Sequence, residues 1–193
     1  MLKVNDIIKN KKRPKEKKPQ RIPLSYRMVQ FAFGTLGRAF PKPFAKLAFR
    51  FFTTPRRRAK HKKSDPILET AQVSEMLVGR NMIKMYEWGT GKKTILLVHG
   101  WESRGTALRS FVMSLVAAGY RVATFDAPAH GDSGGKRVHL VTYSEAFKAL
   151  YYKYENVESI ITHSFGGVVA VYAMVKLDSE MTAQKMVMIA SPS

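Results

Sequence analysis

The chain has 193 residues, more than one domain usually needs but well below two, so we expect one globular unit with extra sequence attached. Apolar residues make up 45% of it and aromatic residues 11%, which is enough for a core and excludes wholesale disorder. The chain has no Cys, which excludes disulfides, thiolate metal sites and a cysteine nucleophile.

The net charge of +19 is concentrated in the first third of the chain. Residues 1–63 hold 20 of the 33 Lys and Arg but only 2 of the 14 Asp and Glu. Residues 64–193 hold the remaining 13 basic and 12 acidic side chains and are nearly neutral. We therefore predict two parts, a basic arm (1–63) and a globular domain (64–193).

The start of the arm, Lys3 to Arg21, is rich in Lys and poor in apolar residues, which predicts disorder. A secretory signal would require an apolar stretch directly after the charged start, so we expect none. The most apolar stretch, Met28 to Phe40, is far shorter than the ~20 residues of a membrane span. We expect a cytoplasmic protein.

The end of the arm predicts an amphipathic basic helix. Its apolar residues recur at helical spacing, namely Phe40, Phe44, Leu47, Ala48 and Phe51, and its basic residues project from the opposite face, namely Lys42, Lys46 and Arg50. Three interpretations stay open. The apolar face packs on the domain, the helix lies on an anionic membrane surface such as the inner membrane face, or the charges bind nucleic acid, which is the least favoured.

From residue 65 onward, strand and helix patterns alternate. Met82 to Trp88 alternates as a half-buried strand, and Gly89 to Gly91 predicts a hairpin turn after it. The further strands are expected at 94–98, 121–125, 157–162 and 185–190, and the helices at 105–118, 142–154 and 168–176. This alternation predicts an α/β fold with a mostly parallel sheet and helices on both faces.

The most informative segment runs from Ile160 to Gly167, where a buried strand passes through Ser164 into a turn of small residues and a helix. This context is typical of a nucleophile elbow, which exposes a serine hydroxyl above the sheet. Gly166 and Gly167 allow the close backbone approach that such a turn requires. Thr162 stands where the G-x-S-x-G motif has its first glycine.

A second candidate element, His99-Gly100-Trp101, ends another buried strand. The backbone N–H groups of Trp101 and Phe165 are therefore candidates for an oxyanion hole, in which each donor contributes about 3 to 4 kcal/mol of transition-state stabilisation.

These motifs, in the order HGW, DAPAHGDS and HSFGG, resemble those of the α/β-hydrolase family, and in particular its bacterial esterase-like members. The resemblance implies that Ser164 attacks an acyl carbon, that Trp101 and Phe165 supply the oxyanion amides, and that the loop from Asp126 to Ser133 shapes the site. It implies no cofactor and no metal. We expect His99, Gly100, Asp126, His130 and His163 to shape the site, together with Gly166 and Gly167.

In this family the triad acid and histidine follow the serine, but no histidine follows His163. Asp178 and Glu180 are the only acids after Ser164, and we expect them on the wrong side of the sheet. We therefore expect an incomplete hydrolase, a fragment or the product of a split gene or frameshift, that has negligible esterase activity on small acyl substrates. The alternative is a non-catalytic basic module with a hydrolase-like scaffold that binds anionic membrane or nucleic acid.

Overall fold

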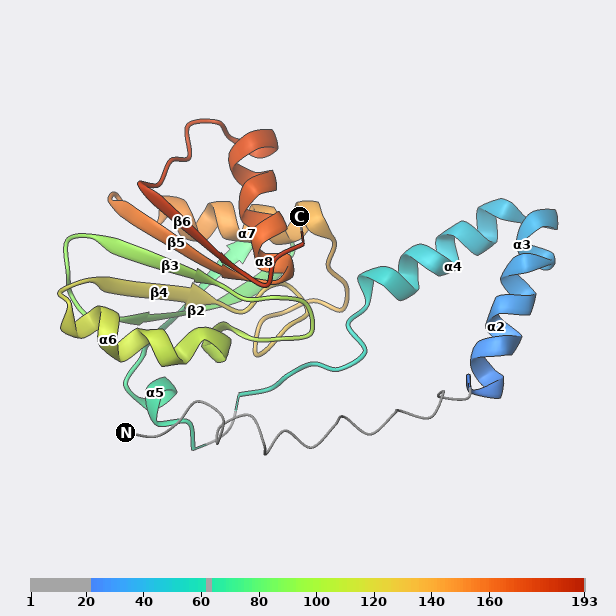
Figure 1. Cartoon of the computed structure of the whole chain (residues 1–193), viewed down its shortest axis with the longest axis horizontal. Helices are drawn as coiled ribbons and strands as arrows, with labels where there is room; N and C mark the ends of the chain where they lie inside the picture. The colour runs from blue at the N-terminus through green and yellow to red at the C-terminus, as the bar shows by residue number, and fades with distance from the viewer. Residues whose placement is uncertain (1–21, 62–63, 193) are drawn as a thin grey trace, which may run out of the picture. The chain divides into compact units, whose positions relative to one another are not determined.

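The computed structural model describes residues 22–61 and 64–192 (Figure 1). It divides into two compact units, Met1–Lys46 and Leu47–Ser193, and the boundary falls inside a helix. The predicted disorder of Lys3 to Arg21 lies outside the described residues. The sheet-containing unit therefore includes residues 47–61, which the charge pattern assigned to the arm.

The first unit consists of helices. They are α2 (Leu24–Gly34), α3 (Leu36–Ala39) and the first part of α4 (Pro41–Thr53). The rings of Phe33 and Phe44 meet edge to face at 5.0 Å and hold α2 against α4. The amphipathic helix expected from Phe40 to Phe51 is present as α4, whereas α2 was not predicted. No helix in the described ranges is both long and apolar enough to cross a bilayer.

The second unit is built on a six-stranded sheet of order β1-β2-β4-β3-β5-β6. The strands are β1 (Gln72–Val78), β2 (Asn81–Trp88), β3 (Thr94–Val98), β4 (Arg121–Phe125), β5 (Val157–His163) and β6 (Lys185–Ile189). Strands β3 to β6 run parallel, and β1 and β2 are antiparallel additions at one edge. The predicted mostly parallel α/β sheet is confirmed.

One predicted connection is wrong. Strand β2 does not form a hairpin with β3 across Gly89–Gly91, because it pairs with β1 on one side and with β4 on the other. The hairpin is instead the β1–β2 pair, whose turn lies at Gly79, a glycine with φ +59°. Strand β1 was not predicted at all.

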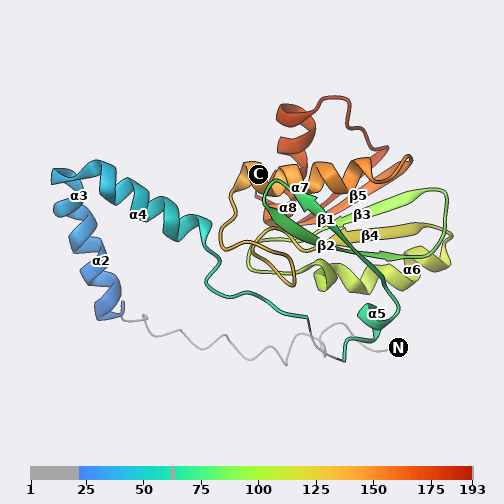
Figure 2. The same cartoon turned by 180° about the vertical axis from the view of Figure 1, so that it is seen from behind.

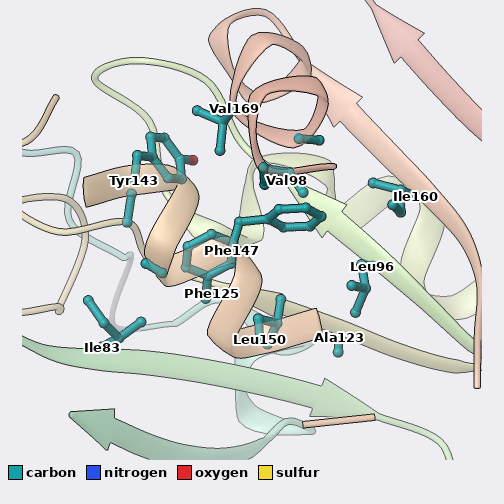
Figure 3. Close-up of a cluster of buried hydrophobic side chains, with 14 of the residues drawn as sticks. Ile83, Leu96, Val98, Ala123, Phe125, Tyr143, Phe147, Leu150, Ile160 and Val169 are labelled. Carbon is teal, nitrogen blue, oxygen red and sulfur yellow. The ribbon is translucent and has the colours of Figure 1, made fainter. Parts of the chain in front are cut away.

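The strands are buried because their apolar side chains point alternately to two cores. In β3, Leu96 and Val98 face one core, and Ile95 and Leu97 face the other. Helices α7 (Leu140–Tyr152) and α8 (Phe165–Tyr172) cover the first face, where Phe147 is fully buried (Figure 3).

The opposite face of the sheet is covered by shorter elements (Figure 2). These are α5 (Pro66–Glu69), η1 (Gly105–Phe111) and α6 (Val112–Ala117). On the first face, η2 (Ala173–Leu177) extends α8. The carboxyl ends of the parallel strands lie at one edge, so the loops after β3, β4 and β5 come together there.

Candidate active site

Ser164 occupies the sharp turn between β5 and α8. Its φ of 51° and ψ of −124° are unusual for a residue with a side chain and cost on the order of 1 to 3 kcal/mol. The turn is held by two backbone hydrogen bonds, from the Ser164 N–H to the Ile189 carbonyl (2.9 Å) and from the Gly167 N–H to the Ser164 carbonyl (3.0 Å). The serine side chain is half-buried, and the strain is of the kind found at functional sites.

Glycines allow the turn to lie directly against the end of β3. A Cβ atom at Gly166 would come within 2.6 Å of the carbonyl oxygens of both Val98 and His99. A Cβ atom at Gly100 would come within 2.9 Å of the Ser164 Cβ atom. The HGW loop and the serine turn are therefore in contact, and side chains at these glycines would separate them.

Two backbone amides border the serine. Trp101 follows Gly100, and Phe165 is the first residue of α8. Neither N–H donates a hydrogen bond to any residue in the described part of the chain. The two side chains meet edge to face at 5.9 Å, which fixes the loop against the helix. The structure thus brings together Ser164 and both amides.

His99 and His130 lie beneath this loop as neutral, buried rings. The Nε2 atom of His99 accepts a hydrogen bond from the Ala127 N–H (3.0 Å), and its Nδ1 donates to the Gly100 carbonyl (2.7 Å). His130 makes the same pattern, because its Nε2 accepts from the Glu102 N–H and its Nδ1 donates to the Pro128 carbonyl, both at 3.0 Å. Each ring thereby ties the HGW loop to the loop after β4.

Acid should destabilise this arrangement. Burial, with a smaller contribution from His130, lowers the pKa of His99 to about 4. The unfolded chain, with an ordinary pKa near 6.5, binds this proton first as the pH falls, so stability declines from about pH 6.5 downward. We expect a loss of about 3 kcal/mol by pH 4, since each pKa unit corresponds to about 1.4 kcal/mol. Urea unfolding at pH 7 and at pH 4 measures this loss of stability, and equal unfolding midpoints at the two pH values would refute the prediction.

Asp126 lies at the centre of a second buried network. Its carboxylate accepts hydrogen bonds from the Gly105 N–H (2.6 Å), the Asp132 N–H (2.8 Å) and the Tyr86 hydroxyl (2.8 Å), and it pairs with His61 Nε2 at 2.8 Å. Burial acts to raise its pKa, but the hydrogen bond and charge of His61 and the two N–H donors hold the pKa below its ordinary value.

His61 is the residue of this network that the sequence did not reveal. Its side chain is only 4% exposed, although it stands in a run of Arg and Lys. Its second nitrogen, Nδ1, lies 3.1 Å from the Thr106 hydroxyl. Nothing in the sequence distinguishes this histidine, because its burial depends on Asp126, which is distant in the chain.

The residues before His61 also contact the site loops. In this basic linker, residues 54–61, the Arg56 N–H donates to the Glu102 carboxylate (2.6 Å) and the Arg58 Nε donates to the Gly131 carbonyl (2.8 Å). Just before it, Thr53 is buried, and its carbonyl accepts from the Val138 N–H. The basic linker is therefore part of the folded site and not simply a solvated charge run.

Comparison with known proteins identifies the family. A sequence model described as "Alpha/beta hydrolase family" matches residues 95–192, about half of the chain. The chain belongs to the α/β-hydrolase family. No curated protein sequence matches it.

Solved structures share the hydrolase fold. A thioesterase domain from the curacin biosynthetic pathway superposes with a TM-score of 0.56 at 22% identity, over 63% of this chain and 47% of its own. An esterase from Exiguobacterium antarcticum superposes with a TM-score of 0.57 at 18% identity, over 62% of this chain and 46% of the esterase. An epoxide hydrolase from Vigna radiata superposes with a TM-score of 0.57 at 20% identity, over 65% of this chain and 42% of the epoxide hydrolase. The chain thus spans less than half the length of these hydrolases.

The structure places the other predicted site residues in different surroundings. The His163 ring lies beside Gly100, but no hydrogen bond joins Ser164 Oγ to any histidine or carboxylate among residues 22–61 and 64–192. Asp178, which pairs with Lys148, and Glu180 lie in the connection that enters β6, at the sheet edge opposite Ser164.

One group of side chains in the described ranges has the spacing of a metal site. Ligand atoms of His61, Asp126 and Asp132 lie within 4.8 Å of one another. The Nε2 atom of His61 and both carboxylate oxygens of Asp126 are already committed to the hydrogen bonds described above. We interpret the group as a structural network, and the absence of a metal from the reaction stays a prediction.

Proposed function

We propose that this hydrolase cleaves a carboxylic ester or a related acyl bond with Ser164 as its nucleophile. The observation that carries the proposal is the strained backbone of Ser164, at a turn bordered by two amides, those of Trp101 and Phe165, without partners in the described part of the chain. Such donors cost no rearrangement when negative charge develops next to them. The thioesterase and esterase among the similar structures act on acyl bonds by name, which supports this class of substrate.

In the reaction, Ser164 Oγ forms a bond to the acyl carbon and loses its proton to a base, while the carbonyl electrons move to the oxygen. The Trp101 and Phe165 amides donate to this oxyanion, and the N-terminus of α8 adds a partial positive charge. The carbonyl then re-forms, the protonated alcohol or thiol leaves, and water hydrolyses the acyl-serine.

The base is the missing component. A serine hydroxyl is a weak nucleophile at neutral pH unless a neighbouring group takes its proton, and no described side chain is hydrogen bonded to Ser164. We therefore expect the 193-residue chain to turn over p-nitrophenyl esters very slowly.

Covalent labelling tests the nucleophile without requiring turnover. We expect prolonged incubation with a fluorophosphonate to modify Ser164 on the order of a hundred-fold faster than the exposed serines Ser110 and Ser179, because the amides stabilise the charge on the attacked phosphoryl group. Peptide mass spectrometry reports all three sites in one sample.

The matched controls are Ser164→Ala, which should remove the fast adduct, and Ser110→Ala, which should leave it unchanged. Urea-unfolded protein should lose the preference for Ser164, because the amides are then no longer arranged around it. Equal modification of the three serines in the folded protein would contradict the proposed function.

A further inference from the structure

We propose that helices α2 and α4 dock on an anionic lipid bilayer, α2 through exposed apolar side chains and α4 through basic side chains beside apolar ones. Helix α2 exposes an apolar stripe at helical spacing. Leu24, Met28 and Phe31 are 73%, 65% and 72% exposed, and no residue of α2 is buried. Large side chains of this kind are normally covered in a folded protein, so the stripe requires a partner.

Helix α4 adds positive charge beside apolar groups. Lys42, Lys46 and Arg50 are four residues apart and lie on one face, whereas Leu47 and Phe51 lie on the other and are exposed. Helices that lie in the membrane interface have this division, with the apolar side among the acyl chains and the basic side at the headgroups. The 13 residues of α4 form a helix of about 20 Å, which suits a position parallel to the surface.

The charge pattern indicates that the partner is negatively charged. No Asp or Glu occurs between Glu16 and Asp65, so the Lys and Arg residues of this stretch have no acidic neighbours in the sequence. Residues 64–193, in contrast, are nearly neutral. A surface without carboxylates is attracted to the negative potential of anionic lipids, at a scale of about five-fold in partitioning for each Lys or Arg near the membrane.

The exposed stripe on α2 favours a bilayer over nucleic acid. Binding to the phosphate backbone needs Lys and Arg and is independent of aliphatic groups. Leu24 and Met28 would have no role in such a complex, whereas both would enter the apolar region of a bilayer. A bilayer is therefore the partner that uses both features of the surface.

Co-sedimentation of the full chain with vesicles tests this docking surface. We expect binding to vesicles of phosphatidylcholine mixed with phosphatidylglycerol, and little binding to phosphatidylcholine alone. The variant Lys42→Gln/Lys46→Gln/Arg50→Gln should bind about a hundred-fold more weakly. The control Arg80→Gln/Lys92→Gln/Lys185→Gln removes the same charge from exposed positions of the sheet-containing unit and should bind as wild type does.

A second variant, Leu24→Gln/Met28→Gln/Phe31→Gln, separates the two classes of partner. All three positions are exposed, so the variant should keep the wild-type circular dichroism and still lose most vesicle binding. Undiminished vesicle binding by this variant, or equal binding to both lipid compositions, would overturn the proposal. So would tight binding to an RNA oligomer that the apolar substitutions leave unchanged and the α4 charge substitutions abolish, without binding to vesicles.

Discussion

Replacing His61 by alanine should lower the free energy of unfolding by about 3 kcal/mol. The substitution removes a buried ring and its hydrogen bond to the ionised carboxylate of Asp126. Because the Asp126 side chain is fully buried, water cannot replace the lost partner. Chemical denaturation of the two proteins under the same conditions measures the difference. Ser64→Ala, three residues further along the chain, is the matched control, because Ser64 is exposed, and it should change stability by less than about 0.5 kcal/mol.

The same variant should release the basic linker. Arg56 and Arg58 precede His61 in the same segment, and hydrogen bonds to Glu102 and Gly131 hold them in place. Once His61 no longer fixes the end of this segment, local opening becomes easier, and trypsin should cut at Arg56 to Lys60 faster than in the wild type. Unchanged cleavage and an unchanged unfolding midpoint would together show that His61 does not hold the linker to the site.

A double-mutant cycle with Tyr86→Phe assigns the effect to the network. The Tyr86 hydroxyl donates to the same carboxylate oxygen that His61 contacts. Substitutions that share a partner are not additive, so the double variant should differ from the sum of the single variants by about 0.5 kcal/mol or more. Strict additivity would mean that the two residues stabilise the protein independently.

Replacing Gly166 by alanine should cost about 3 kcal/mol of stability and most of the reactivity of Ser164. The added methyl group would lie 2.6 Å from two backbone carbonyl oxygens at the end of β3, and backbone cannot move aside as a flexible side chain can. The start of α8 must therefore shift away from the HGW loop, which separates the Phe165 amide from the Trp101 amide.

Thermal unfolding and the fluorophosphonate adduct rate measure the two effects. Gly34→Ala is a suitable control, because nothing lies within 4 Å of a Cβ atom there, and it should leave both quantities near wild type. A Gly166→Ala protein that unfolds like the wild type and labels at the same rate would show that the turn tolerates a side chain, contrary to the geometry.

The sequence predicted the part of the fold that depends on local pattern. Strands β3, β4 and β5 are short apolar runs that end in turn-forming residues, so their positions follow from neighbouring residues alone. The same holds for the turn at Ser164, because a strand, a serine, two glycines and a helix stand next to one another. The Ser164 contact with Gly100 then follows from the pairing of β3 with β5.

The features that the sequence did not reveal depend on contacts between distant residues. The chain reverses direction between β2 and β3, but the two strands do not pair, because β4, which follows the next strand and helix in the chain, lies between them in the sheet. Helix α2 was not found because, besides its stripe of Leu24, Met28 and Phe31, it also carries the apolar residues Tyr26 and Val29, which obscure the helical pattern in the sequence. His61 belongs by composition to the charged arm, and only the folded position of Asp126 makes it part of the site.

We propose that the Trp101 and Phe165 amides form an oxyanion hole above Ser164. A crystal structure of the chain with a phosphonyl group bound to Ser164 tests it most directly, because the phosphonyl oxygen imitates the oxyanion of acyl transfer. We predict that this oxygen lies within about 3 Å of both amide nitrogens, at hydrogen-bond distance. A phosphonyl oxygen that points to solvent, away from both amides, would show that the two amides do not form an oxyanion hole.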